Sequence, residues 1–131
     1  MSEKIKVVLL EPGKLARTAE IDASLAGMQK VVGGLIEPFY PFEEQVCIVC
    51  NEESKINGMR PNRSVKNDDG VMVDFIFGPA FICDCRGENL ASLSDEQIDR
   101  YGKMFRYPEH LARVNCTLFG IPYRPQPEQE R

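Results

Sequence analysis

Residues 46–50, Val-Cys-Ile-Val-Cys, constrain the fold more than any other stretch, because they form an unbroken apolar run between Gln45 and Asn51. A short apolar run rich in β-branched residues predicts a strand that is buried on both faces. Such a strand lies inside a sheet, so other segments of the chain have to pair with it. It leads into a polar segment that extends to Arg63, and loops that follow buried strands are common places for binding groups.

Other segments have the composition of strands and are separated by turn signals. Pro12-Gly13 divides two of them and predicts an N-terminal hairpin, and Gly78-Pro79 divides two more. Pro38 and Pro41 lack an N–H to donate, so the segment that contains them is predicted to be an edge strand or an irregular segment. The predicted strands and extended segments cover residues 4–11, 15–21, 35–42, 45–50, 71–77, 80–85 and 115–121.

A first helix is predicted after Asp22, whose carboxylate can accept a hydrogen bond from the first helical turn. Leu25, Met28 and Val32 follow at helical spacing and predict one apolar stripe. Gly33-Gly34 is predicted to end the helix, because glycine readily adopts the left-handed conformation of a helix C-terminus.

A second helix has the clearest start signal in the chain. Ser94 and Gln97 have the spacing of a capping box, in which each side chain binds the backbone N–H of the other residue. Tyr101 and Phe105, together with Ile98, predict the buried stripe of this helix, and Pro108 is predicted to end it. One further helical turn is predicted over residues 108–114.

These segments predict an α+β fold, with a mixed, mainly antiparallel sheet of about five strands and two principal helices packed on it. The chain is predicted to be a single domain over residues 1–121. Residues 122–131 are rich in Pro, Gln and Glu, and they are predicted to form a flexible C-terminal tail.

Composition argues against several functional classes. The formal net charge is −4, whereas a protein that neutralises nucleic-acid phosphates needs a basic surface, so a nucleic-acid partner is disfavoured. No apolar run approaches the roughly 18 residues of a membrane-spanning helix, so no membrane association is expected. Five cysteines, an odd number, without a predicted export signal favour reduced thiols and a cytoplasmic location.

Residue types that carry catalysis or bind metals lack convincing patterns. Cys47 and Cys50 have CxxC spacing, but positions three apart in a strand face opposite ways, so core packing is preferred over a zinc site. His110 is the one histidine and is expected near a helix end, away from any nucleophile motif. We therefore expect no catalytic residue, metal or cofactor. A metal-dependent hydrolase that uses Glu52 or Glu53 remains an open alternative.

The polar segment after the central strand contains the candidate ligand-binding residues. Arginine and lysine suit phosphate or carboxylate groups, asparagine both donates and accepts, and a nearby tyrosine can stack on a base. The alternative interpretation is purely structural: the asparagines form turns, and the Arg63 side chain lies over the core. The predicted site consists of Tyr40, Asn51, Glu52, Lys55, Asn62 and Arg63.

Several short motifs occur in an order that resembles a known family. They are EPGK at residues 11–14, EID at 20–22, VGG at 32–34, CNEE at 50–53 and NR at 62–63. This order is similar to that of the domain-of-unknown-function family thirty-eight forty-six, over roughly residues 5–109. Ser54 stands where a glycine is usual in that family, and the segment beyond Glu109 has no counterpart there.

The resemblance implies a cytoplasmic accessory protein of phages or bacterial mobile elements, a class that often counters host defence. We therefore expect a non-enzymatic protein that sequesters a small anionic, nucleotide-like ligand at the predicted site. The alternative is a protein–protein interaction module that binds and inhibits a host protein through residues 35–42 or a helix face. Homo-oligomerisation is expected because one chain of this size offers little depth for a closed pocket.

Overall fold

The computed structural model describes residues 3–125. Residues 1–2 and 126–131 lie outside the described residues, and they include most of the predicted tail. The part of that tail that is described begins with Pro122, which ends the last strand, and Tyr123, whose ring stacks on His110.

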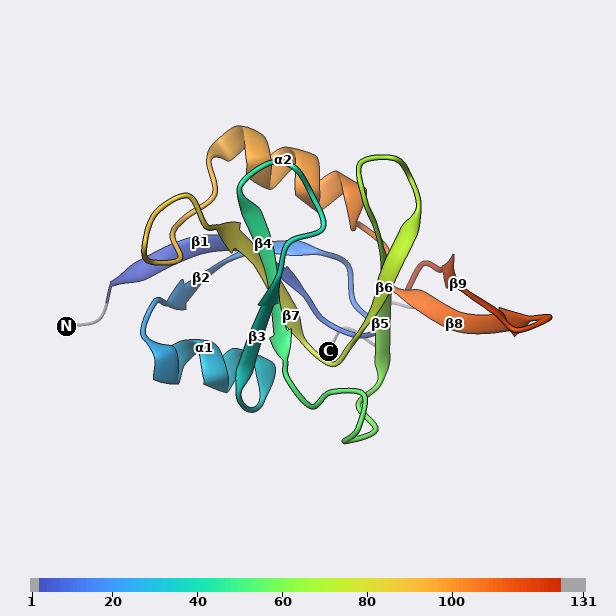
Figure 1. Ribbon diagram of the computed structural model, residues 1–131. Coiled ribbons are helices and arrows are strands. Elements are labelled where there is room, and N and C mark those ends of the chain that lie inside the picture. Colours follow the sequence, from blue (N-terminus) through green and yellow to red (C-terminus); the bar gives the residue numbers. More distant parts are fainter. Residues whose placement is uncertain (1–2, 126–131) are drawn as a thin grey trace.

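A five-stranded antiparallel sheet forms the centre of the molecule, with the strand order β2-β1-β7-β4-β3 (Figure 1). Its strands are β1 (Lys4–Leu10), β2 (Arg17–Asp22), β3 (Ile36–Phe39), β4 (Val46–Asn51) and β7 (Ala80–Asp84). Strand β4 lies between β7 and β3, as the apolar run predicts, and β3 with its Pro38 is an edge strand. The predicted α+β fold, with its mainly antiparallel sheet and two helices, is confirmed.

One helix covers each face of the sheet, because the side chains of a strand alternate between the two faces. Helix α1 (Leu25–Val32) packs its Met28 and Val32 against one face, and helix α2 (Asp95–Met104) packs Tyr101 against the other. Figure 1 shows α2 above and α1 below the strands.

The helix ends follow the predicted signals with two corrections at α1. The N-cap is Ser24, whose Oγ accepts from Gly27 N at 3.0 Å, and Asp22 instead accepts from Ser24 N. Leu25, the first residue of α1, is 60% exposed and does not belong to the buried stripe, which consists of Met28 and Val32. Gly33 ends α1 with a φ of 83°, and the capping box of Ser94 and Gln97 is present at α2.

Two hairpins lie outside the sheet. Strands β5 (Pro61–Lys66) and β6 (Met72–Phe77) form one, and the polar segment predicted as a loop therefore ends in a strand. Val65 and Ile76 pack this hairpin on the same sheet face as α2.

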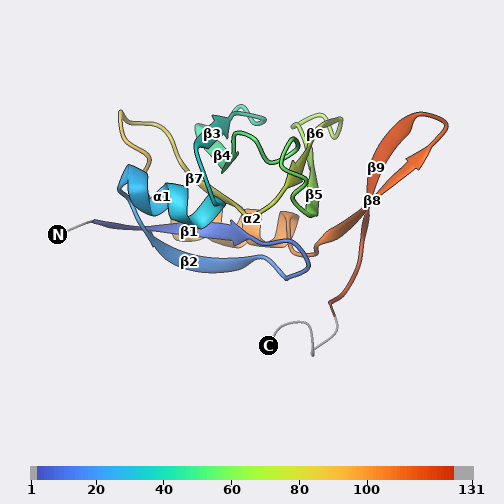
Figure 2. The same ribbon diagram turned by 90° about the horizontal axis from the view of Figure 1, so that it is seen from below.

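The second hairpin corrects the helical turn predicted over residues 108–114. These residues instead contain β8 (Glu109–Val114), which pairs with β9 (Thr117–Pro122). The connecting residues Asn115 and Cys116 have positive φ values of 51° and 72°, as a tight two-residue hairpin turn requires. Figure 2 shows that this hairpin projects from the rest of the molecule.

Candidate functional site

Arg63, the cation expected to bind an anionic ligand, is completely buried and bound to the backbone. Its Nε donates to Phe105 O at 2.6 Å, and its Nη2 donates to Lys14 O at 2.6 Å. Its Nη1 donates to Glu11 O at 3.2 Å. Burial lowers the pKa of Arg63 to about 10, so the guanidinium stays charged at neutral pH. The side chain thus joins the β1–β2 turn to the end of α2.

Asn62 is also completely buried. Its Nδ2 donates to Leu10 O at 3.0 Å and to Gly78 O at 2.8 Å, which joins the end of β1 to the β6–β7 connection. Within residues 3–125, every buried side-chain nitrogen or oxygen atom has a hydrogen-bond partner. Asn62 and Arg63 therefore hold separate segments of the fold together. This structural role is distinct from the predicted ligand binding.

Asn51 holds the end of helix α1. Its Nδ2 donates to Val32 O at 3.2 Å, and its Oδ1 accepts from Glu53 N at 2.7 Å. A Cβ atom added to Gly34 would lie 2.8 Å from Asn51 Nδ2, so a larger residue here would force this amide to shift. For Asn51, the turn-forming interpretation describes the observed contacts.

Two of the remaining predicted residues, Glu52 and Lys55, lie at a cleft between β3, the segment after β4, and β6, which we call the β3–β6 cleft. Its volume is about 200 Å³. Glu52 and Lys55 line it together with part of Asn51, whereas Tyr40, 62% exposed, is not among its lining residues. The lining residues are Glu37, Phe39, Cys50, Asn51, Glu52, Ser54, Lys55, Ile56, Asp74, Phe75, Ile76 and Phe77.

The charges that line this cleft are mainly negative. Three carboxylates, those of Glu37, Glu52 and Asp74, lie beside a single ammonium group, that of Lys55. Lys55 Nζ is already paired with Asp74 Oδ1 at 2.6 Å. Burial, followed by the charges of Glu37 and Asp74, raises the pKa of the Cys50 thiol to about 11.

The cleft also has an aromatic lining. Phe75 and Phe77 have ring centroids 5.5 Å apart, and Phe39 contributes from β3. An apolar lining with carboxylates around it suits a group with an apolar stem and a positive end, such as a lysine or arginine side chain. The volume is below the roughly 300–1,000 Å³ of small-molecule sites, so the cleft accommodates a side chain better than a whole nucleotide.

Comparison with known proteins identifies the family. The model of a domain of unknown function, DUF3846, matches residues 5–106 of the 131-residue chain. The chain belongs to the DUF3846 family. No curated protein and no solved structure matches it significantly.

Motifs that carry the resemblance to the DUF3846 family contact one another in the structure. The EPGK turn, residues 11–14, receives the guanidinium of Arg63 through the carbonyl groups of Glu11 and Lys14. The VGG segment, residues 32–34, receives the amide of Asn51 through Val32 O. These residues therefore stabilise the DUF3846 fold, which leaves the β3–β6 cleft as the candidate site.

Among residues 3–125, no group of three or more His, Cys, Asp or Glu side chains is placed to hold a metal ion. His110 lies on β8 and stacks on Tyr123 with 4.0 Å between ring centroids. No helix of the described part of the chain is long and apolar enough to cross a membrane.

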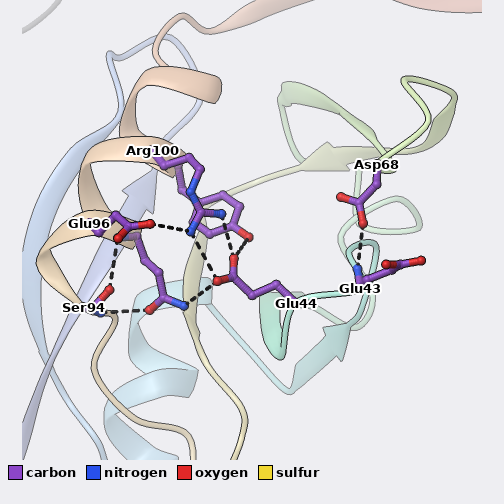
Figure 3. Close-up of polar contacts among 8 residues, drawn as sticks. Glu43, Glu44, Asp68, Ser94, Glu96 and Arg100 are labelled. Carbon is purple, nitrogen blue, oxygen red and sulfur yellow. Dashed lines mark hydrogen bonds and ion pairs between the residues drawn. The ribbon is translucent and has the colours of Figure 1, made fainter.

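A cluster around Glu44 joins the β3–β4 connection to α2 (Figure 3). Glu44 Oε1 accepts from Tyr101 Oη at 2.5 Å and from Arg100 Nη1 at 2.8 Å, and Oε2 accepts from Gln97 Nε2 at 3.0 Å. These contacts use both oxygens of the carboxylate to hold α2 against the sheet, so we interpret the cluster as structural.

The cysteines of this DUF3846 protein are expected to react with iodoacetamide one after another, in an order set by their exposure and pKa. Cys116 is exposed at the β8–β9 turn and reacts first, whereas Cys47 and Cys83 are buried with their sulfurs 3.7 Å apart. Burial raises the pKa of Cys85 to about 11, and the neighbouring Cys47 thiol and burial raise that of Cys83, which lowers the reactive thiolate fraction.

Mass spectrometry of timed alkylation checks this order. One fast modification at Cys116 is expected, with Cys47 and Cys83 modified only in urea. Modification of Cys83 at the rate of Cys116 in native buffer would contradict the observed packing.

Proposed function

We propose that this DUF3846 protein is a non-enzymatic accessory protein of a phage or mobile element that binds and inhibits a host defence protein in the host cytoplasm. The observation that carries this proposal is the negatively charged, aromatic β3–β6 cleft beside an edge strand. A basic, extended segment of the partner is the group that this surface suits.

The edge strand supports this mode of binding. Strand β3 pairs with β4 and with no other strand of the described residues, so its second edge is available to an added strand. Glu37 and Phe39 are two residues apart on β3 and therefore face the same side, toward the cleft. A lysine or arginine of the bound segment would place its stem on Phe39 and its charge near Glu37.

Charge reversal at the cleft tests the proposal. The probe is a fluorescein-labelled peptide of alternating Val and Arg residues, and its affinity is measured by fluorescence anisotropy. Glu37→Lys is expected to weaken binding at least about tenfold, because it replaces a carboxylate that attracts the arginines with an ammonium group that repels them. A tenfold loss in affinity corresponds to about 1.4 kcal/mol.

Glu20→Lys is the matched control, because Glu20 is an exposed residue on β2, the opposite edge strand of the same sheet. It introduces the same charge change and is expected to leave the affinity within twofold. Equal losses in both variants would show that only the overall charge matters, and the cleft would then not be the site. A peptide with Glu in place of Arg is expected not to bind.

A small anionic, nucleotide-like ligand is the second candidate. It is favoured by Lys55, whose side chain is 58% exposed at the cleft and offers an ammonium group. This ligand ranks second because three carboxylates line the cleft and would repel an anion, and because the cleft is small. A nucleotide that binds the native state at a concentration of about 100 Kd would stabilise it by about 2.7 kcal/mol, which thermal unfolding detects.

A further inference from the structure

Three cysteines lie together on the sheet face that α1 covers. Cys47 of β4 and Cys83 of β7 are directly opposite each other in the antiparallel register, and both are completely buried. Their sulfurs are 3.7 Å apart. Cys85 lies two residues beyond Cys83, on the same face, and is half-buried. We call these three residues the cysteine cluster. Cys50 packs on the opposite face of the sheet.

The backbone of the two strands suits a bond between the facing cysteines. Residues directly opposite each other in an antiparallel pair have Cα atoms about 4.5–5.5 Å apart. Cysteines joined by a disulfide usually have Cα atoms about 4.4–6.8 Å apart. The pairing of β4 with β7 therefore holds Cys47 and Cys83 at a separation that a disulfide accepts, with their sulfurs already in contact.

Contacts within the cysteine cluster make its three thiols unequal. A hydrogen bond from the Cys83 thiol lowers the pKa of Cys47, burial opposes this effect, and a hydrogen bond from Cys85 adds to the lowering. The contact with Cys47 raises the pKa of Cys83, and burial raises that of Cys85 to about 11. Because the thiolate is the nucleophile, Cys47 is the expected attacking group and Cys83 is the partner that closes the bond.

We propose that Cys47 and Cys83 are a site of reversible oxidation, at which hydrogen peroxide forms a disulfide between β4 and β7. Cys85 marks the route of entry, because it is the half-buried member of the cluster and hydrogen peroxide is little larger than water. A reversible bond suits a reducing cytoplasm, where protein disulfides are usually transient. The disulfide links the two ends of the segment that contains β5, β6 and most of the residues lining the β3–β6 cleft.

The oxidation takes place in two displacements. The Cys47 sulfur attacks one oxygen of hydrogen peroxide, the O–O bond breaks, and the departing hydroxide takes up the Cys47 proton and leaves as water. The Cys83 sulfur then attacks the sulfur of the Cys47 sulfenic acid, the S–O bond breaks, and the departing hydroxide takes up the Cys83 proton. Two thiols are thereby oxidised to one disulfide, and one hydrogen peroxide is reduced to two water molecules.

Differential labelling of the full chain tests the proposal. The protein is treated with hydrogen peroxide in native buffer, its free thiols are alkylated in urea, and its disulfides are then reduced and alkylated with a heavy-isotope form of the same reagent. Tandem mass spectrometry is expected to find the heavy label on Cys47 and Cys83 to equal extents. Dithiothreitol added before the first alkylation is expected to remove it. In a parallel sample, dimedone traps the sulfenic acid of the exposed Cys116 and shows that the peroxide has reacted.

Cys83→Ala is expected to abolish the heavy label on Cys47, because it removes the sulfur that closes the bond, and Cys83→Ser replaces it if it does not fold. Cys50→Ala is the matched control, since Cys50 is on the same strand as Cys47 but packs on the other face, and it is expected to keep the label. The proposal is overturned if Cys47 and Cys83 of the unchanged protein stay light once Cys116 has reacted, or if only one of them is heavy. It is equally overturned if Cys47 keeps its label without Cys83, or loses it in Cys50→Ala.

Discussion

Replacing Arg63 with methionine is expected to destabilise the folded protein by about 3–5 kcal/mol. The guanidinium is buried and donates to the carbonyl groups of Glu11, Lys14 and Phe105. Methionine fills similar space but cannot donate, so these acceptors lose their partner in a place that water does not readily reach. A loss of this size is a large share of the total stability of a small domain, about 5–15 kcal/mol.

Urea unfolding followed by circular dichroism at pH 7 measures this effect. Arg60→Met is the matched control, because Arg60 lies three residues away and is exposed. Its change is expected to stay within about 0.5 kcal/mol, as for most surface substitutions. A loss below about 1 kcal/mol for Arg63→Met would contradict the structural role of Arg63.

This experiment also separates the two interpretations of the NR motif, residues 62–63. If Arg63 bound a ligand from an exposed loop, its replacement would weaken ligand binding and leave stability nearly unchanged. If it stabilises the fold, the stability falls first. The hydrogen bonds to backbone carbonyl groups favour the second outcome.

The sequence predicts most of the sheet and both helices because their signals are local. The apolar run before Asn51, the turn at Pro12-Gly13, the capping box at Ser94 and the glycine after Val32 each act within a few residues. Such signals need no knowledge of distant parts of the chain.

The partners of Arg63 could not be predicted in the same way. They are backbone carbonyl groups of the β1–β2 turn and of the end of α2, and every residue of the chain has such a group. Nothing in the side chains of those segments indicates that an arginine binds there. An arginine among polar residues therefore has the sequence appearance of an exposed loop residue.

Strand β8 shows how pairing overrides local composition. Residues 109–114, Glu-His-Leu-Ala-Arg-Val, include good helix formers and follow a proline, which predicts a helical turn. The turn at Asn115-Cys116 instead aligns them with β9, so cross-strand contacts decide their conformation.

The candidate cleft was only partly predictable. Glu52 and Lys55 follow the central strand and were expected at a site, but Glu37, Asp74 and the aromatic residues come from β3 and β6. Their proximity depends on β6 packing outside the sheet beside β3 and β4, which sequence spacing does not encode. The sign of the charge in the cleft therefore became clear only from the fold.

Removing the carboxylate of Glu44 is expected to destabilise the protein by about 2 kcal/mol at pH 7, because bonds to Arg100, Tyr101 and Gln97 are lost together. The expected loss is modest because the Glu44 side chain is 35% exposed, and solvent screens its pairing with Arg100. Urea unfolding of Glu44→Ala measures it. Glu43→Ala is the control, since Glu43 contacts Asp68 through its backbone N–H and its side chain points away from α2 (Figure 3).

The effect of Glu44→Ala is expected to depend on pH in a defined direction. Hydrogen bonds from Arg100, Tyr101 and Gln97 lower the pKa of Glu44 from 4.5 to about 2. A group whose pKa is lower in the folded state stabilises that state above its unfolded pKa, and this contribution is lost as the pH falls toward the folded pKa. The stability difference between the unchanged protein and Glu44→Ala should therefore be constant above about pH 5.5 and shrink between pH 4.5 and pH 2.

A double-mutant cycle with Tyr101→Phe assigns part of this energy to a single hydrogen bond. Because Tyr101 Oη donates to Glu44 Oε1, the two substitutions are expected to be non-additive by about 1 kcal/mol at pH 7. The coupling should weaken toward pH 2, where about half of Glu44 is protonated in the folded state and the carboxylate no longer accepts with a full charge. Additive effects at pH 7, or a difference between the unchanged protein and Glu44→Ala that does not vary with pH, would show that Glu44 does not join the β3–β4 connection to α2 through its charge.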